Sequence, residues 1–148
     1  KLMAQNEVEL YLVFSRIRSM EAADLRQRNQ ALATRCLNFA SGVLDLCEQF
    51  PAGAVPRAIA LQVSRSAGSI GANLEEAFGS YSRPEFAYCT NIAKREAREA
   101  RYWLRLVSLR RWNLDERLAP LLTESDELVR ILTVIVKKVQ APKPPSEL

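Results

Sequence analysis

The scarcity of helix-breaking residues is the feature that most constrains the fold of this chain. Its 148 residues include only five glycines and seven prolines, and long stretches contain neither. Glycine and proline are the residues that most weaken a helix interior, so segments of about twenty or more residues can stay continuously helical. The length fits one domain with a single core. The sequence therefore predicts an all-α domain.

Four segments have apolar residues at the three-to-four spacing of one helical face. We expect helices over residues 29–50, from about Pro56, from Ser82 to about Arg111, and from Asp115 to Gln140. Pro51 and Gly53 end the first helix, and Ser82-Arg83-Pro84-Glu85 matches a capping box at the start of the third. Long amphipathic helices with short connections predict an antiparallel up-and-down four-helix bundle.

The apolar positions predict which side of each helix is buried. On the second helix, Gly68 and Gly71 weaken the helix, so their presence indicates close approach of a neighbouring helix. The first helix is expected to bury Ala33, Leu37, Ala40, Leu44 and Cys47, broadened by Leu32, Phe39 and Leu46. The second is expected to bury Ile59, Val63, Ala67, Ile70, Leu74 and Ala77. The fourth is expected to bury Leu118, Leu121, Ser125, Leu128, Leu132, Ile135 and Val139.

The two ends of the chain fall outside the expected bundle of residues 29–140. Residues 1–28 form an N-terminal extension, in which Val8, Leu10 and Leu12 alternate like a strand while the same region also steps like a helix. Met20 is a candidate native start, which would make the residues before it an upstream extension or vector-derived. Residues 141–148 are rich in proline and are expected to form an extended, flexible tail.

Composition argues against most enzyme classes. The chain has no histidine, which removes the usual acid–base residue at neutral pH, the Ser-His and Cys-His dyads and the commonest metal ligand. Its three cysteines form no CxxC pair and are expected to be small buried residues. We therefore expect no enzymatic activity, no metal and no cofactor. Without an apolar stretch long enough to span a membrane or a signal peptide, a cytoplasmic protein is expected.

Positive charge is concentrated in the third helix. Residues 94–111 contain seven basic and two acidic side chains. On a helical wheel, Lys94, Arg98, Arg101 and Arg105 fall within roughly 60° of arc, with Arg95 in the same segment. Such a stripe suits the phosphates of RNA or DNA because the planar arginine fork matches phosphate oxygens. A second interpretation stays open, in which neighbouring acidic residues or other subunits pair with these cations.

Aromatic residues are interspersed among these arginines, among them Tyr88, Tyr102, Trp103 and Trp112. They can be read as platforms on which nucleic-acid bases stack. For Trp103 we instead expect a core position, and Tyr102 and Trp112 are candidates for a subunit contact.

Glu96 is placed by the same wheel in the middle of the apolar side of the third helix. A carboxylate there needs partners, since an unpaired buried charge is costly. The uncharged flank of the second helix offers hydrogen-bond donors in Gln62, Ser66 and Asn73, and Arg65 is an ionic partner. We expect this network to fix helix register or the subunit interface. An enzymatic role for Glu96 beside Glu75 or Glu76 is disfavoured, because no nucleophile arrangement accompanies it.

Segments of the second and third helices carry a family resemblance. These are Ser64-Arg65-Ser66-Ala67, Ser69-Ile70-Gly71-Ala72-Asn73, Lys94-Arg95-Glu96-Ala97-Arg98-Glu99 and Tyr102-Trp103-Leu104. The chain resembles, over roughly residues 29–140, the bacterial four-helix bundle family encoded in intervening sequences of 23S ribosomal RNA genes. That family is related to the accessory variability protein of diversity-generating retroelements. Where this chain has Leu74-Glu75-Glu76-Ala77-Phe78, the family more often has an alanine-glutamate-glycine ending.

The resemblance implies more about assembly than about chemistry. It implies a four-helix bundle that forms a homopentameric ring, and nucleic-acid binding as an accessory factor. By analogy it also implies a reverse transcriptase as a partner. An oligomeric protein–protein scaffold with no nucleic-acid role is the alternative function.

Overall fold

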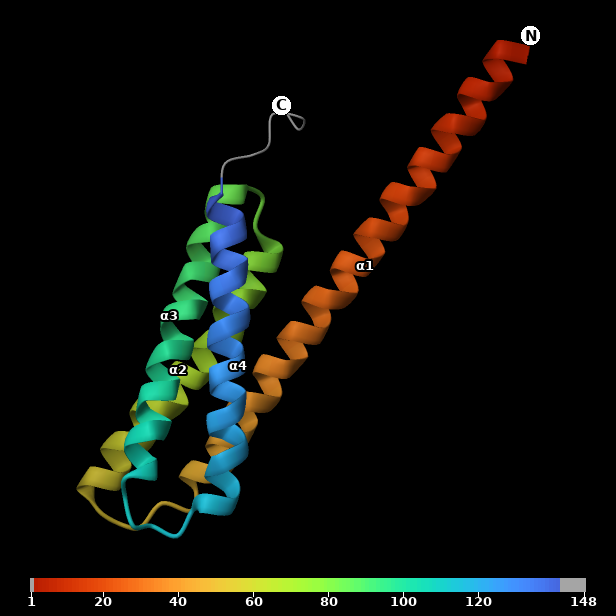
Figure 1. Ribbon diagram of the computed structural model, residues 1–148. Coiled ribbons are helices and arrows are strands. Elements are labelled where there is room, and N and C mark those ends of the chain that lie inside the picture. The colour runs from red at the N-terminus through yellow and green to blue at the C-terminus, as the bar shows by residue number, and fades with distance from the viewer. Residues whose placement is uncertain (1, 142–148) are drawn as a thin grey trace. The chain divides into compact units, whose positions relative to one another are not determined.

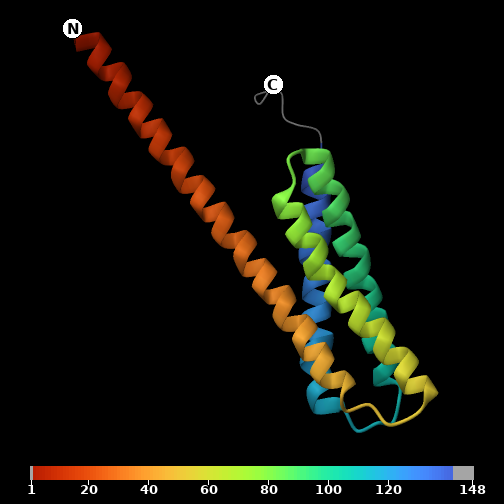
Figure 2. The ribbon, with the colours of Figure 1, turned by 180° about the vertical axis from the view of Figure 1, so that it is seen from behind.

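The computed structural model describes the backbone of residues 2–141 and the side chains of Arg16 and residues 19–141. It contains α1 (Leu2–Cys47), α2 (Ala54–Gly79), α3 (Arg83–Ser108) and α4 (Asp115–Gln140). In the bundle these helices run alternately up and down, with two of the three connections at one end and the α2–α3 turn at the other (Figures 1 and 2). The predicted all-α, up-and-down four-helix bundle is confirmed.

The first helix differs from its predicted bounds. We expected it over residues 29–50, but α1 is one helix from Leu2 to Cys47. The residues up to Leu32 form a unit of their own, and the bundle unit begins at Ala33. In the first unit, the described side chains of residues 19–28 are all exposed, and Arg28 pairs with Asp24 one turn earlier at 3.0 Å. Of the predicted tail, only Ala141 lies within the described residues.

Contacts between side chains establish the order of helices around the bundle. Part of α1 lies beside α2, since a Cβ at Gly71 would be 3.6 Å from the Cβ of Cys36. α1 also lies beside α4, where Arg35 forms an ion pair with Glu124. Helix α3 is joined to α2 by the ion pair between Arg65 and Glu99, and to α4 by the ion pair between Arg101 and Asp126. Each helix of the bundle therefore has two neighbours around a central core.

The predicted buried face of α1 is wrong in part. Leu37 and Leu44 are 69% and 54% exposed, whereas the buried residues are Ala33, Cys36, Phe39, Val43 and Leu46. The helix is rotated so that small residues meet its neighbours, as at Cys36 and Gly42. A Cβ at Gly42 would be 3.0 Å from Cδ2 of Leu121, so this glycine permits the close approach of α1 and α4.

The predicted faces of α2 and α4 agree better with the structure. All six apolar residues predicted for α2 are buried, together with Ser66. In α4, Leu118, Ser125, Leu128 and Leu132 are buried, while the predicted Leu121, Ile135 and Val139 are half-buried. Of the two glycines expected to mark close approach, Gly71 faces α1, but no atom lies within 4 Å of a Cβ built at Gly68.

The ends of α3 and α4 are held together by local and long-range hydrogen bonds. As the capping box predicts, Ser82 Oγ accepts from the backbone N–H of Glu85 at 3.3 Å, and the Glu85 carboxylate accepts from the N–H of Tyr81 at 3.1 Å. Arg83 then donates to the carbonyls of Val139 and Ala141, at 3.0 and 2.8 Å. These carbonyls at the end of α4 have no partner within the helix, so Arg83 caps it.

Candidate nucleic-acid interface

Three arginines on the outer side of α3 are free of acidic partners. Arg95, Arg98 and Arg105 are exposed. In the described part of the chain, none of the three has a carboxylate within ion-pair distance. Because they lie on the side of α3 turned away from the core, their guanidinium groups point into solvent. They form the candidate interface, which we call the α3 outer face.

The other two basic residues of the predicted stripe are placed differently. Arg101 is only 28% exposed, and its Nη1 lies 3.2 Å from Oδ1 of Asp126 on α4. Lys94 is half-buried. Of the four cations predicted as one stripe, Arg98 and Arg105 are therefore in solvent, Arg101 lies at the α3–α4 contact and Lys94 is half-buried. Sequence alone did not reveal this, because Asp126 is brought to Arg101 only by tertiary packing.

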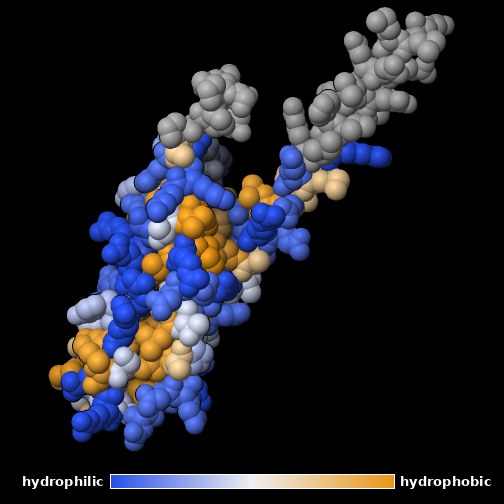
Figure 3. Space-filling model, in the orientation of Figure 1, coloured by the Kyte–Doolittle hydropathy of each residue, from blue (hydrophilic) through white to orange (hydrophobic). Residues whose placement is uncertain are grey.

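A shallow groove follows the α3–α4 contact beside the α3 outer face. It is lined by Arg101, Asp126, Arg130 and Lys137, with apolar and hydroxyl side chains between them. Arg130 is paired with Glu127 at 2.7 Å. In the view that presents α4, apolar areas alternate with strongly hydrophilic ones (Figure 3). The mixed charges of this groove make it less positive than the α3 outer face.

Aromatic residues accompany the free arginines. Tyr88 and Tyr102 are 68% and 60% exposed. The ring of Tyr102 meets that of Trp103 edge-on, with centroids 5.3 Å apart and planes 75° apart. Trp103 is half-buried rather than in the core as expected. Trp112 packs within the chain on Phe50, at 5.0 Å between centroids, with Arg110 over its ring.

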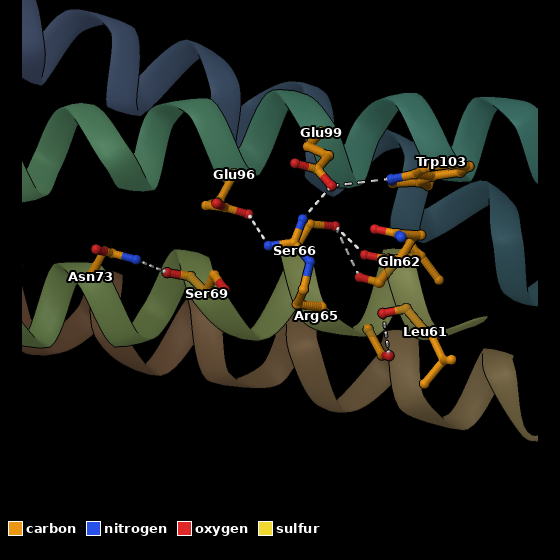
Figure 4. Close-up of polar contacts among 11 residues, drawn as sticks. Leu61, Gln62, Arg65, Ser66, Ser69, Asn73, Glu96, Glu99 and Trp103 are labelled. Carbon is orange, nitrogen blue, oxygen red and sulfur yellow. Dashed lines mark hydrogen bonds and ion pairs between the residues drawn. The ribbon is translucent and has the colours of Figure 1, made fainter. Parts of the chain in front are cut away.

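A polar cluster joins α2 to α3 on the flank of the α3 outer face (Figure 4). Arg65 of α2 donates to the carboxylate of Glu99, and Nε1 of Trp103 donates to the same carboxylate at 3.3 Å. Glu96 is 18% exposed, and its Oε2 lies 3.6 Å from Nη1 of Arg65. The hydrogen bond from Arg65 to Glu99, aided by the charge of Glu96, raises the pKa of Arg65. The acidic residues nearest the α3 outer face are thus engaged with α2.

The predicted hydrogen-bond network around Glu96 is wrong for its uncharged members. Ser66 donates to the carbonyl of Gln62 at 2.9 Å, and Asn73 donates to that of Ser69 at 2.8 Å. The side chain of Gln62 is exposed. These short side chains bond to their own helix because a backbone carbonyl one turn earlier is always within reach. Only Arg65 approaches Glu96, whose Oε2 is buried without a hydrogen bond.

Sequence reasoning also missed the central role of Glu99. In the second interpretation of the arginine stripe, Glu99 is among the acidic residues that pair with it, whereas its carboxylate turns to Arg65 and Trp103. The spacing of Glu99 and Trp103, one turn apart on the helix, was the available signal. Arg65 was expected as the ionic partner of Glu96, and the structure brings it to the carboxylates of both Glu96 and Glu99.

The titratable groups of the core offer little nucleophilic chemistry. Burial raises the pKa of Cys36 to about 12 and that of Cys47 to about 11, so both thiols are protonated at neutral pH. Glu75 and Glu76 are both exposed, whereas Glu96 is half-buried. Among the described residues there is no group of three potential metal ligands, and no helix long and apolar enough to cross a bilayer.

Three leucines on α1 and α2 within the bundle unit are exposed. Leu37 and Leu44 of α1 and Leu61 of α2 are exposed. Leu61 lies on the same side of α2 as Gly68, seven residues further along, where no atom lies within 4 Å of an added Cβ. We call Leu37, Leu44 and Leu61 the α1–α2 leucine patch.

Comparison with known proteins identifies relatives of the chain without giving an activity. The profile of the 23S rRNA-intervening sequence protein family matches residues 28–134. A crystal structure of a protein with unknown function from the S23 ribosomal protein family of Bacteroides thetaiotaomicron VPI-5482 is 31% identical. The match covers 74% of this chain and 97% of that one, with a TM-score of 0.64. No curated protein matches the sequence.

Proposed function

The chain belongs to the 23S rRNA-intervening sequence protein family, and from this membership we propose that it is a non-enzymatic, self-associating accessory protein that binds RNA or DNA. Nucleic acid binds through the α3 outer face. The observation that carries the proposal is the presence of three exposed guanidinium groups on one side of one helix, with no carboxylate beside them in the described part of the chain.

The dimensions of the α3 outer face suit a phosphate backbone. Arg95 and Arg105 are ten residues apart, or about 15 Å along a helix at 1.5 Å per residue. A strand of B-form DNA rises 3.4 Å per phosphate, so this length corresponds to roughly four phosphates. Arginine side chains binding phosphates release condensed counterions, which gives affinity without sequence selectivity. The function expected is therefore general backbone binding.

Self-association is supported by the α1–α2 leucine patch. Leu37 and Leu44 are seven residues apart and so share one side of α1. Exposed apolar residues that cluster mark interaction sites more often than single ones do. We propose that copies of the chain meet through this patch, in the pentameric ring that the family resemblance implies. A ring would repeat the α3 outer face and strengthen its positive potential. The reverse transcriptase partner, which rests on analogy alone, is part of the same proposal.

A protein–protein scaffold is the second candidate function. It is favoured by the same leucine patch, and the free arginines of α3 would then pair with carboxylates of a partner protein. In this case nucleic acid would compete only weakly for the α3 outer face. The two functions differ in one respect: only the first predicts that a phosphate backbone alone binds to the protein.

The experiment compares two triple variants with the unaltered protein. The test variant is Arg95→Gln, Arg98→Gln and Arg105→Gln, which keeps side-chain length while removing the charges. The matched control removes three exposed arginines from α1, α2 and α4 and so lowers the net charge equally: Arg26→Gln, Arg57→Gln and Arg117→Gln. Binding of fluorescent RNA and DNA is measured by anisotropy at low salt, and solution mass is measured for each protein.

We expect the test variant to lose most of its affinity at unchanged solution mass, and the control to keep most of it. Equal losses in both variants would show that only net charge matters, which would refute the assignment to α3. Loss of the assembly in the test variant would instead support the scaffold. Failure of the unaltered protein to bind any nucleic acid would refute the proposed function altogether.

A further inference from the structure

The α3 outer face combines exposed aromatic rings with its arginines in a regular order. Tyr88, Arg95 and Tyr102 follow one another at intervals of seven residues, which keeps them on one line along the helix within about 20° per step. Arg98 and Arg105 each lie three residues after a member of this line, on the adjoining row. The result is an alternation of ring, cation and ring across about 21 Å of helix.

We propose that this face binds single-stranded nucleic acid, with bases stacked on Tyr88 and Tyr102 and phosphates held by Arg95 and Arg98. The inference rests on the proposed function and adds the class of ligand. Backbone binding alone needs only the arginines. The tyrosines favour a single strand, because its bases are free to stack on exposed rings.

Both tyrosine rings are available for stacking. Each is more than half exposed, and in the described part of the chain neither hydroxyl forms a hydrogen bond. Tyr102 meets Trp103 edge-on rather than face-to-face, so these two rings are not stacked. An exposed ring gains free energy when a nucleic-acid base stacks on it, and this gain does not depend on the identity of the base.

Duplex nucleic acid would use this face poorly. Its bases are already stacked on one another, so a ring on a helix surface meets only their edges unless a base is flipped out. A single strand exposes the faces of its bases and bends to follow the row of rings. Arg95, midway between the rings, and Arg98, one turn further along, are placed to hold the phosphates between two stacked bases.

Acidic side chains do not obstruct this surface. Glu99, the carboxylate in the middle of α3, accepts hydrogen bonds from Arg65 and Trp103 on the α2 side. Glu96 is also turned toward Arg65. Repulsion between these carboxylates and a bound phosphate is therefore reduced, because the charge of Arg65 lies beside both.

The test uses three fluorescent probes of equal length: single-stranded oligothymidylate, the same backbone without bases, and a DNA duplex. The variants are Tyr88→Ala with Tyr102→Ala, and Tyr88→Phe with Tyr102→Phe. The matched control is Tyr81→Ala, which removes a fully exposed tyrosine from the α2–α3 turn. Far-ultraviolet circular dichroism and a thermal melt confirm that each variant is folded.

We expect the single strand to bind at least about tenfold more tightly than the abasic backbone, as stacking energies above 1.4 kcal/mol require. The alanine pair should lose this advantage, while its affinity for the abasic backbone stays the same. The phenylalanine pair and Tyr81→Ala should behave as the unaltered protein.

Equal binding of the single strand and the abasic backbone, with no effect of the alanine pair, would overturn the stacking proposal and leave backbone binding intact. Duplex binding as tight as single-strand binding would overturn it as well. Absence of binding to all three probes would instead refute the proposed function, and the two failures are thereby distinguished. Loss of a protein–protein contact in the alanine pair, with nucleic-acid binding unchanged, would assign the tyrosines to a protein partner and also overturn the proposal.

Discussion

Two glycines inside the bundle provide a sharp test of its packing. Glycine in a helix interior costs about 0.5–1 kcal/mol relative to alanine. At Gly71 an added Cβ would lie 3.6 Å from the Cβ of Cys36, an ordinary contact, so Gly71→Ala should raise the free energy of unfolding by about 0.5–1 kcal/mol. At Gly42 the same atom would lie 3.0 Å from Cδ2 of Leu121. The end of the half-buried Leu121 side chain must then shift by a few tenths of an ångström, so Gly42→Ala should gain clearly less stability than Gly71→Ala, by about 1 kcal/mol.

The assay is urea denaturation followed by circular dichroism, with thermal melts in parallel. For a chain of this length about 1 kcal/mol shifts the Tm by roughly 2–4 °C, so the two variants should move in different directions or by clearly different amounts. Both substitutions gain the same helix propensity, which makes each the control for the other. A gain of stability in Gly42→Ala equal to that in Gly71→Ala would refute the close contact of α1 with α4.

Three further predictions concern assembly, the α2–α3 cluster and pH. Replacing Leu37, Leu44 and Leu61 by serine should leave the melting behaviour of the bundle nearly unchanged but reduce the solution mass; an unaltered mass would exclude the patch from the subunit contact. Glu96→Met should leave stability equal or higher by about 1 kcal/mol, because it removes a buried carboxylate oxygen that lacks a hydrogen bond, whereas a loss above about 3 kcal/mol would show a strong ion pair with Arg65. Stability should fall as pH rises from about 9 toward 12, since the unfolded chain releases the Cys36 proton at its ordinary pKa of 9.0 while the fold raises that pKa to about 12. Urea titrations of Cys36→Ala should show a smaller decline, and parallel declines in the two proteins would contradict this cause.

Local patterns in the sequence predicted the parts of the fold that depend on one helix at a time. The buried face of α2 was correct because Val63, Ile70 and Leu74 lie on one side with few apolar residues elsewhere. The start of α3 was correct because Ser82 and Glu85 form a cap within four residues. Neither inference required knowledge of a neighbouring helix.

The side of α1 that is buried depended on its neighbours and was mispredicted. Leucines occur on two sides of that helix, and their spacing favours the stripe containing Leu37 and Leu44. The helix instead buries the side that carries Cys36, because small residues there allow α2 and α4 to approach. That side also carries Phe39, Val43 and Leu46, so large apolar side chains are buried there in place of the two leucines, which periodicity alone does not show.

The candidate site was predictable as a concentration of charge but not as a surface. Sequence placed Arg98 and Arg101 on the same stripe, yet Arg101 binds Asp126 while Arg98 is free. Sequence likewise offered Ser66 as a donor to Glu96, but its hydroxyl bonds to its own helix. In both cases the partner was decided by distances between helices that only the folded chain defines.

The salt dependence of single-strand binding tests the central claim most directly, namely that Arg95, Arg98 and Arg105 contact phosphates. Each contact to a single strand contributes about 0.7 to the slope of log Kobs against log salt concentration, so removing all three charges should reduce the slope by about 2. The control variant, with the same net charge, should retain the slope of the unaltered protein. Identical slopes for the unaltered protein and the α3 variant would contradict the account.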